Sequence, residues 1–110
     1  MKFAIPFAEG KLAVHFGHSQ AFALIEVEEN QIKNTEYLVP PPHEPGVLPK
    51  WLSGLGTNVI IAGGMGHRAI TLFDQYGIKV ITGAPESEPE ALVTSYLEDR
   101  LVTGKNVCDH

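Results

Sequence analysis

Residues that commonly bind metals are spread over several parts of this 110-residue chain. His15 and His18 form an H-x-x-H pair that brackets Phe16 and Gly17. The other candidates are isolated: His43 after three prolines, His67 after a glycine-rich stretch, and Cys108 and His110 at the end of the sequence. Imidazole nitrogens and thiolates are donors for copper, iron and zinc, and for the metal atoms of sulfide clusters. We therefore take these six histidine and cysteine residues as candidate metal ligands.

A glycine-rich stretch offers a different kind of chemistry. Gly63, Gly64, Met65 and Gly66 separate a buried apolar run from a predicted helix. Glycines before a helix N-terminus let backbone N–H groups face an anion, and Arg68 adds a positive charge beside them. A phosphate, a molybdate or an anionic metal–sulfur cluster would suit such a site. The candidate cofactor-binding residues are His15, Phe16, Gly17, His18, Gly63, Gly64, Met65, Gly66 and Arg68.

Purely structural explanations compete with these assignments. An H-x-x-H pair alone does not make the four-ligand pattern of a structural zinc site. The glycines could serve only a sharp turn, and Met65 could simply fill a gap in the core. No P-loop or complete G-x-G-x-x-G motif occurs, so nucleotide binding has little support. There is no G-x-S-x-G motif, and Cys108 stands too close to the end to be a rigidly held nucleophile, so we expect no enzyme.

Composition indicates one globular domain over residues 1–110, with residues 102–110 as a flexible polar tail. The chain is 44% hydrophobic and 19% charged, which is enough apolar material for a buried core. The net charge of -5 and the scattered basic residues argue against a nucleic-acid partner. A single cysteine, no long apolar segment at the start and no run of membrane-spanning length predict a cytoplasmic protein that does not enter a membrane.

Hydrophobic periodicity predicts the elements that must position these residues. Strands are expected at 2–7, 21–28, 31–39, 58–62 and 78–81, and the second and third form a hairpin around Glu29-Asn30. Helices are expected from about 46 to 55, at 67–76 and at 86–101, the last with acidic residues in its first turn. The alternation predicts a mixed α/β sheet of about five strands with flanking helices. Ligands of such sheets gather outside the carboxyl ends of parallel strands, where the first loop and the glycine turn should both open.

Three segments together resemble the dinitrogenase iron–molybdenum cofactor biosynthesis family. They are His15-Phe16-Gly17-His18-Ser19, the stretch from Ile60 through the glycine turn to Ala69, and Gly77-Ile78-Lys79-Val80. The resemblance covers residues 2–101 or thereabouts, and the combination is specific although each piece alone is not. It implies a ribonuclease-H-like fold without nuclease carboxylates. The family positions matched here are the first-loop residues 15–18 and the turn residues 63–68.

The resemblance also implies a function. Family members bind iron–molybdenum cofactor or its precursors during nitrogenase assembly, and the orange protein of anaerobic bacteria carries a molybdenum–copper sulfide cluster. Partners would be metallocluster assembly proteins or a scaffold-type P-loop ATPase. We therefore expect a carrier of an anionic metal–sulfur cluster.

Two other classes of function stay open at this point. The first is a module that binds no metal and regulates such an ATPase. The second is a hydrolase on the ribonuclease-H-like scaffold, which would need several carboxylates at strand ends. Only Glu26 and Glu28 stand on the predicted core strands. The oligomeric state is not indicated by the sequence.

Overall fold

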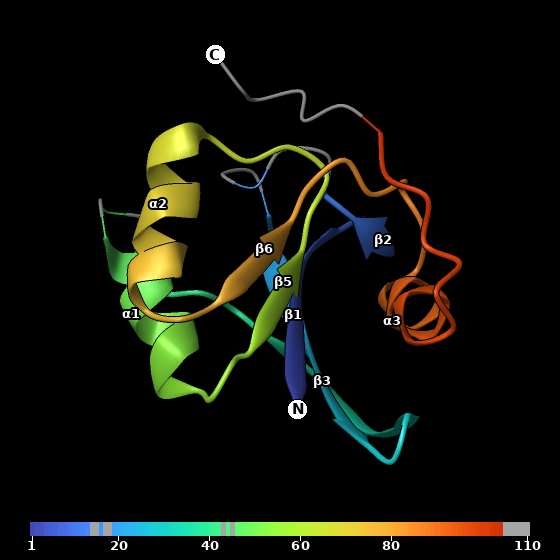
Figure 1. Ribbon diagram of the computed structural model, residues 1–110. Helices are drawn as coiled ribbons and strands as arrows, with labels where there is room; N and C mark the ends of the chain where they lie inside the picture. The colour runs from blue at the N-terminus through green and yellow to red at the C-terminus, as the bar shows by residue number, and fades with distance from the viewer. Residues whose placement is uncertain (14–15, 17–18, 43, 45, 105–110) are drawn as a thin grey trace.

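The computed structural model describes residues 1–13, 16, 19–42, 44 and 46–104 (Figure 1). Its strands are β1 (Lys2–Ala8), β2 (Lys11–Leu12), β3 (Ala21–Glu28), β4 (Gln31–Leu38), β5 (Val59–Ile61) and β6 (Lys79–Ile81). Its helices are α1 (Val47–Gly54), α2 (His67–Gln75) and α3 (Pro89–Leu97). None of the helices in the described part of the chain has the length and apolar character needed to cross a membrane.

One mixed sheet organises the molecule. The strand order is β4-β3-β1-β5-β6, and the two-residue β2 pairs with the end of β1. β1 is antiparallel to β3 and parallel to β5, which is in turn parallel to β6. Glu29 and Asn30 both have positive φ, 53° and 61°, as the tight β3–β4 turn requires. The predicted α/β fold with a mixed sheet and flanking helices is therefore confirmed, with β2 as an additional short strand.

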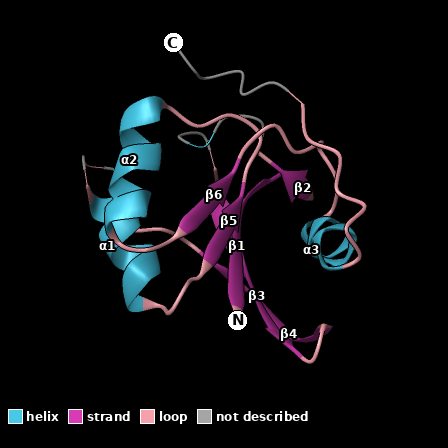
Figure 2. Ribbon diagram, viewed as in Figure 1, coloured by secondary structure: helices cyan, strands magenta, loops and turns pink. Residues whose placement is uncertain are grey.

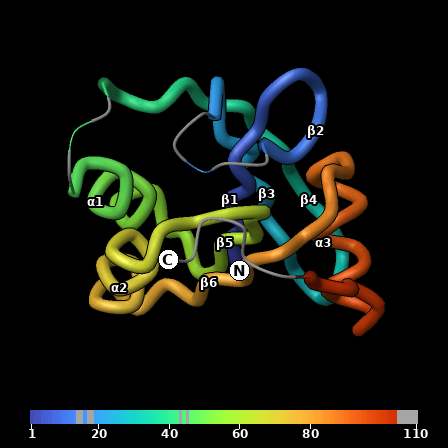
Figure 3. The backbone as a smooth tube through the Cα atoms, turned by 90° about the horizontal axis from the view of Figure 1, so that it is seen from above, coloured from blue at the N-terminus to red at the C-terminus, as the bar shows by residue number. Residues whose placement is uncertain are grey.

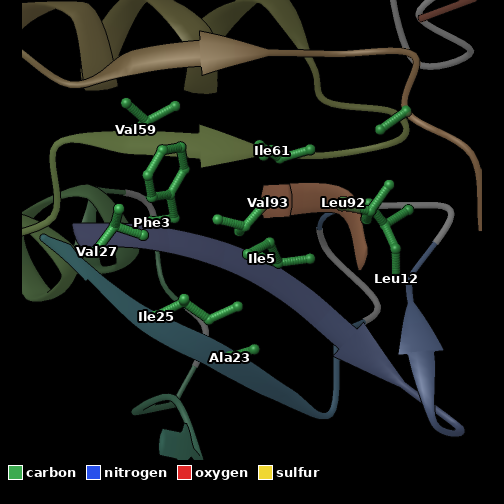
Figure 4. Close-up of a cluster of buried hydrophobic side chains, with 11 residues drawn as sticks. Phe3, Ile5, Leu12, Ala23, Ile25, Val27, Val59, Ile61, Leu92 and Val93 are labelled. Carbon is green, nitrogen blue, oxygen red and sulfur yellow. The ribbon is translucent and has the colours of Figure 1, made fainter. Parts of the chain in front are cut away.

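The helices lie on opposite faces of the sheet. Figure 2 shows α1 and α2 together on one side and α3 alone on the other. Successive side chains of a strand point to opposite faces, so β1 supplies Phe3 and Ile5 to the α3 side and Ala4 to the α1/α2 side. The α3 cluster, drawn in Figure 4, joins strand residues to Leu92 and Val93 of α3. The second cluster joins the other strand face to Leu52 of α1 and Phe73 of α2.

The last helix is shorter than predicted. We expected residues 86–101, but α3 begins at Pro89, with Glu88 extended at φ -65° and ψ 141°. A residue that precedes proline is disfavoured in the helical region, which accounts for the extended Glu88 and for a first turn that begins at Pro89. The helix ends at Leu97, and Asp99 adopts a φ of 57°. Of the predicted acidic first turn only Glu90 remains, while Glu86 forms an ion pair with Lys11.

Thr57, just before β5, gives a prediction about stability. Its side chain is only 6% exposed, and its Oγ1 has no hydrogen-bond partner among the described residues. A buried hydroxyl without a partner costs free energy, so Thr57→Val should raise the free energy of unfolding by about 1 kcal/mol. Urea denaturation of Thr35→Val provides the contrast, because Thr35 Oγ1 donates to Glu90 Oε2 at 2.6 Å and its loss should destabilise. Equal effects of the two substitutions would contradict this explanation.

Candidate functional site

Four segments that are distant in sequence meet beyond the carboxyl ends of the parallel strands. They are the first loop, represented by Phe16, the glycine turn (residues 63–66) after β5, residues 82–84 after β6, and residues 102–104 after α3. Figure 3 views the molecule toward this edge, with the loops from β5 and β6 crossing above the sheet. We call these four segments the rim. Backbone hydrogen bonds, described below, hold them together.

Phe16 attaches the first loop to the glycine turn. Its backbone N–H donates to the carbonyl oxygen of Gly64 at 2.9 Å. Its ring is 7% exposed and makes edge contacts with Phe22 and Phe73, each with ring centroids 5.6 Å apart. The Ser19 hydroxyl donates to the Phe16 carbonyl oxygen at 3.0 Å and closes the loop behind it. Phe16 is therefore an anchor for the loop that carries the H-x-x-H pair.

The glycine turn leads directly into α2. Gly66 is the N-cap residue, with φ -65° and ψ 150°, and no side chain caps the helix. The first backbone hydrogen bond of α2 runs from Ile70 N–H to the Gly66 carbonyl oxygen. The N–H groups of residues 67–69 therefore have no acceptor inside the helix. α1 and α3 also begin without a side-chain cap. What distinguishes α2 is that its N-terminus opens at the rim, with Arg68 exposed beside it.

On the other side of the turn, backbone bonds run from one glycine to the next. Gly83 N–H donates to the Gly63 carbonyl oxygen at 2.7 Å, and Gly104 N–H donates to the Gly83 carbonyl oxygen at 2.6 Å. Ala84 N–H adds a bond to the Ala62 carbonyl oxygen at 3.1 Å. The glycine turn is thus held by the first loop on one side and by the β6 loop on the other.

The structure separates the predicted binding residues into three groups. His67 and Arg68 are exposed at the start of α2, and Gly66 is exposed before them. Met65 is fully buried in the cluster under α1 and α2, and Gly63, Gly64 and most of Phe16 are buried with it, so these residues support the turn from inside. Outside the described residues lie His15, Gly17, His18, His43, Cys108 and His110.

The described rim is suited to an anion and does not by itself form a metal centre. Within the described ranges, no three His, Cys, Asp or Glu side chains are grouped so that they could hold a metal ion. The first turn of α2 contains no acidic residue that would repel an anion. A metal site would need candidate ligands outside those ranges in addition to His67.

Two hollows on the described surface lie away from the rim. One of about 530 Å³ runs between α2 and β6 and is lined by Ile70, Thr71, Asp74, Gly77, Ile78, Lys79 and Val80. Another of about 760 Å³ lies between the β3–β4 turn and the end of α3, where Glu29, Tyr96 and Asp99 contribute to its wall. Neither is lined by a residue of the glycine turn.

Comparison with known proteins identifies the family. The family model for dinitrogenase iron-molybdenum cofactor matches residues 1–99, which include the first loop, the glycine turn and the β6 loop. The chain belongs to this family. The match confirms the resemblance seen in the sequence. It covers every segment of the rim except residues 102–104.

Individual proteins are similar to this one over nearly the whole chain. Protein MJ0580 of Methanocaldococcus jannaschii is 32% identical in an alignment of 106 residues that covers 92% of this chain and 89% of that protein. The crystal structure of PH0822 has a TM-score of 0.88 at 28% identity and covers 96% of each chain. The apo form of the orange protein from Desulfovibrio gigas has a TM-score of 0.75 at 17% identity, covering 96% of this chain and 93% of that one. This last likeness shows a shared fold.

The β6 loop is a part of the rim that the sequence pattern did not predict. Gly83 was not among the predicted site residues, and Gly104 fell within the predicted tail. One signal was available, because Gly83 follows the last parallel strand closely and Pro85 follows it, so the loop had to leave the same edge of the sheet. Nothing in the local pattern around Gly104 indicates that it returns to Gly83.

Proposed function

We propose that this member of the family carries an anionic metal–sulfur cluster as cargo, held at the rim of the sheet. The cargo would be an iron–molybdenum cofactor precursor or a molybdenum–copper sulfide. The observation that carries the proposal is the bond from Phe16 N–H to the Gly64 carbonyl oxygen, because it ties the histidine loop to the glycine turn. This bond supports the proposal that the candidate metal ligands His15 and His18 and the amide donors for anionic sulfur belong to one site.

Backbone amides and one guanidinium supply the support for an anion. The N–H groups of residues 67–69 lack intrahelical acceptors and carry the positive end of the α2 dipole. Arg68 is exposed at the same end of the helix. Sulfide atoms of an anionic cluster accept hydrogen bonds from such groups, which stabilises the charge without a covalent bond to the protein. Candidate imidazoles His15 and His18 would complete the site by ligating metal.

A carrier of this kind needs affinity and controlled release but no chemical turnover. We therefore propose that the protein is not an enzyme, and that it passes its cargo in the cytoplasm to metallocluster assembly proteins or to a scaffold-type P-loop ATPase. Membership of the cofactor family supports the assembly role. The cytoplasmic setting is supported by the presence of one cysteine in the whole sequence.

Anaerobic reconstitution tests the proposal directly. The purified protein is incubated with copper(I) and tetrathiomolybdate, and separately with iron, molybdate and sulfide, and then desalted. We expect retained metal and a visible chromophore in the wild type, and a loss of both in the His15→Ala/His18→Ala double variant. Equal retention by the two proteins would refute the proposed role of the histidines. Absence of metal from both, together with stable binding of an ATPase partner, would favour the non-metal interaction module.

Gly66 allows the anion-binding half of the site to be tested separately. A Cβ built at Gly66 meets no atom within 4 Å, and its φ is one that alanine adopts, so Gly66→Ala should fold with a stability loss of about 1 kcal/mol or less. The added methyl group would occupy open space at the α2 N-terminus, where the cargo is proposed to lie, and we expect at least about tenfold weaker cargo binding in a metal titration. Gly54→Ala is the matched control, because a Cβ at Gly54 also meets no atom within 4 Å but lies at the end of α1. Identical titrations for the two variants would exclude the α2 N-terminus from the site.

A further inference from the structure

The backbone of Gly104 lies so close to Gly83 that there is no room for a side chain at position 83. Gly83 has a φ of +78°. A Cβ built on it would lie 2.7 Å from the carbonyl carbon and 2.9 Å from the nitrogen of Gly104, and closer still to the Gly104 oxygen. Since real Cβ atoms do not approach backbone atoms to such distances, any residue other than glycine at 83 must displace Gly104.

The segment that Gly83 holds has few other attachments. Leu101 packs at the edge of the α3 cluster, but residues 102–104 are exposed and form neither helix nor strand. Val102 is 80% exposed, so it contributes almost no hydrophobic burial. Among the contacts of the described residues, the bond from Gly104 N–H to the Gly83 carbonyl oxygen is therefore the main constraint on the end of this segment. A segment held by few contacts opens at a low free-energy cost.

We propose that residues 102–104 form a strap that closes one side of the rim, with Gly83 as the residue that positions it, and that the strap must detach for cargo to enter or leave. The inference rests on the proposed function, because the rim is taken as the cargo site. Its basis is the series of bonds from Gly104 to Gly83 and from Gly83 to Gly63, the first residue of the glycine turn. A change at the cargo site is thereby connected to the strap through two backbone hydrogen bonds.

The chain supplies a matched control for the variant that should detach the strap. Gly83→Ala introduces both an unfavourable φ and the clash with Gly104. Gly77→Ala introduces the same kind of strain, at φ +75°, but its Cβ would meet nothing within 4 Å. A second pair of variants changes Gly104, the other residue of the contact. Gly104→Pro removes the donor N–H, whereas the Cβ of Gly104→Ala would make an ordinary 3.8 Å contact with the Gly83 oxygen and keep the bond.

Two measurements on the full chain test the inference. In the cargo-free protein, amide hydrogen exchange followed by NMR should show the Gly104 N–H protected in the wild type and in Gly77→Ala, and exchanging on the order of ten times faster in Gly83→Ala. In protein loaded with copper(I) and tetrathiomolybdate, transfer of copper to a strong chelator should be on the order of ten times faster for Gly83→Ala and Gly104→Pro than for the wild type. Gly77→Ala and Gly104→Ala should release copper at the wild-type rate.

The possible outcomes separate the strap from the proposed function. Equal release rates from all loaded proteins would overturn the strap as a gate and leave the carrier role intact. A wild type that retains no metal would overturn the carrier role and the gate together. An unprotected Gly104 amide in the wild type would show that the strap is not attached, and would overturn the inference whatever the metal does.

Discussion

Phe16→Ala is expected to lower the free energy of unfolding by about 3–5 kcal/mol and to abolish cargo retention as well. The ring is buried between Phe22 and Phe73, so its removal leaves a cavity in the cluster under α1 and α2. The same side chain keeps the Phe16 N–H in place against the Gly64 carbonyl oxygen. Chemical denaturation gives the first effect, and metal analysis after anaerobic reconstitution gives the second.

A milder substitution distinguishes the two consequences. Phe16→Leu keeps most of the apolar volume and should cost less than about 1.5 kcal/mol. We expect this variant to retain its cargo, because the loop stays anchored. If Phe16→Ala remained folded and bound cargo as well as the wild type, the anchor role of Phe16 would be wrong. If Phe16→Leu lost its cargo while folded, the ring itself would have a role that the buried geometry does not provide.

Phe73→Ala should destabilise the protein by a similar amount, about 3–5 kcal/mol. Phe73 is fully buried in the middle of α2, and its ring meets Phe16 at an interplanar angle of 87°. Its loss removes the main contact between α2 and the first loop, and we expect a lower denaturant midpoint with an unchanged slope. The effect should be visible in cargo-free protein.

Tyr76→Ala is the control for Phe73 at the end of the same helix. The Tyr76 side chain is 46% exposed, so its removal should change the free energy of unfolding by far less, about 0.5 kcal/mol. A loss for Phe73→Ala that is no larger than the loss for Tyr76→Ala would show that the cluster can collapse around the missing ring. In that case α2 would not depend on the aromatic contacts for its position.

Most of the fold could be predicted because its signals are local. The β-branched run Val59–Ile61 indicated a buried strand, and Glu29-Asn30 indicated the hairpin turn. The predicted bounds of α3, residues 86–101, were wrong at both ends, because the helix begins at Pro89 and ends at Leu97. The helix is limited by the backbone restriction before Pro89 and by the left-handed conformation of Asp99. Hydrophobic periodicity gives no information about either limit. β2 has two residues, too few to show any period.

The site was predictable to the extent that it follows from strand order. The first loop and the glycine turn were expected at the same edge because both follow parallel strands, and the structure joins them through Phe16 and Gly64. The Gly83–Gly104 contact depends on the path of the chain after α3, which no local pattern encodes. The roles of Phe16 and Met65 also needed the structure, since a buried aromatic ring and a buried thioether look the same in sequence as exposed ones. The roles of the candidate histidines stay predictions.

The two buried clusters determine where substitutions could change the geometry of the rim. They lie on opposite faces of one sheet, and both reach the rim, where Met65 belongs to one and Ala84 to the other. A small repacking in either cluster would alter the spacing between the glycine turn and the β6 loop. Laboratory selection for tighter or looser cargo retention should therefore recover substitutions deep inside both layers, many residues away from any group that touches the metal.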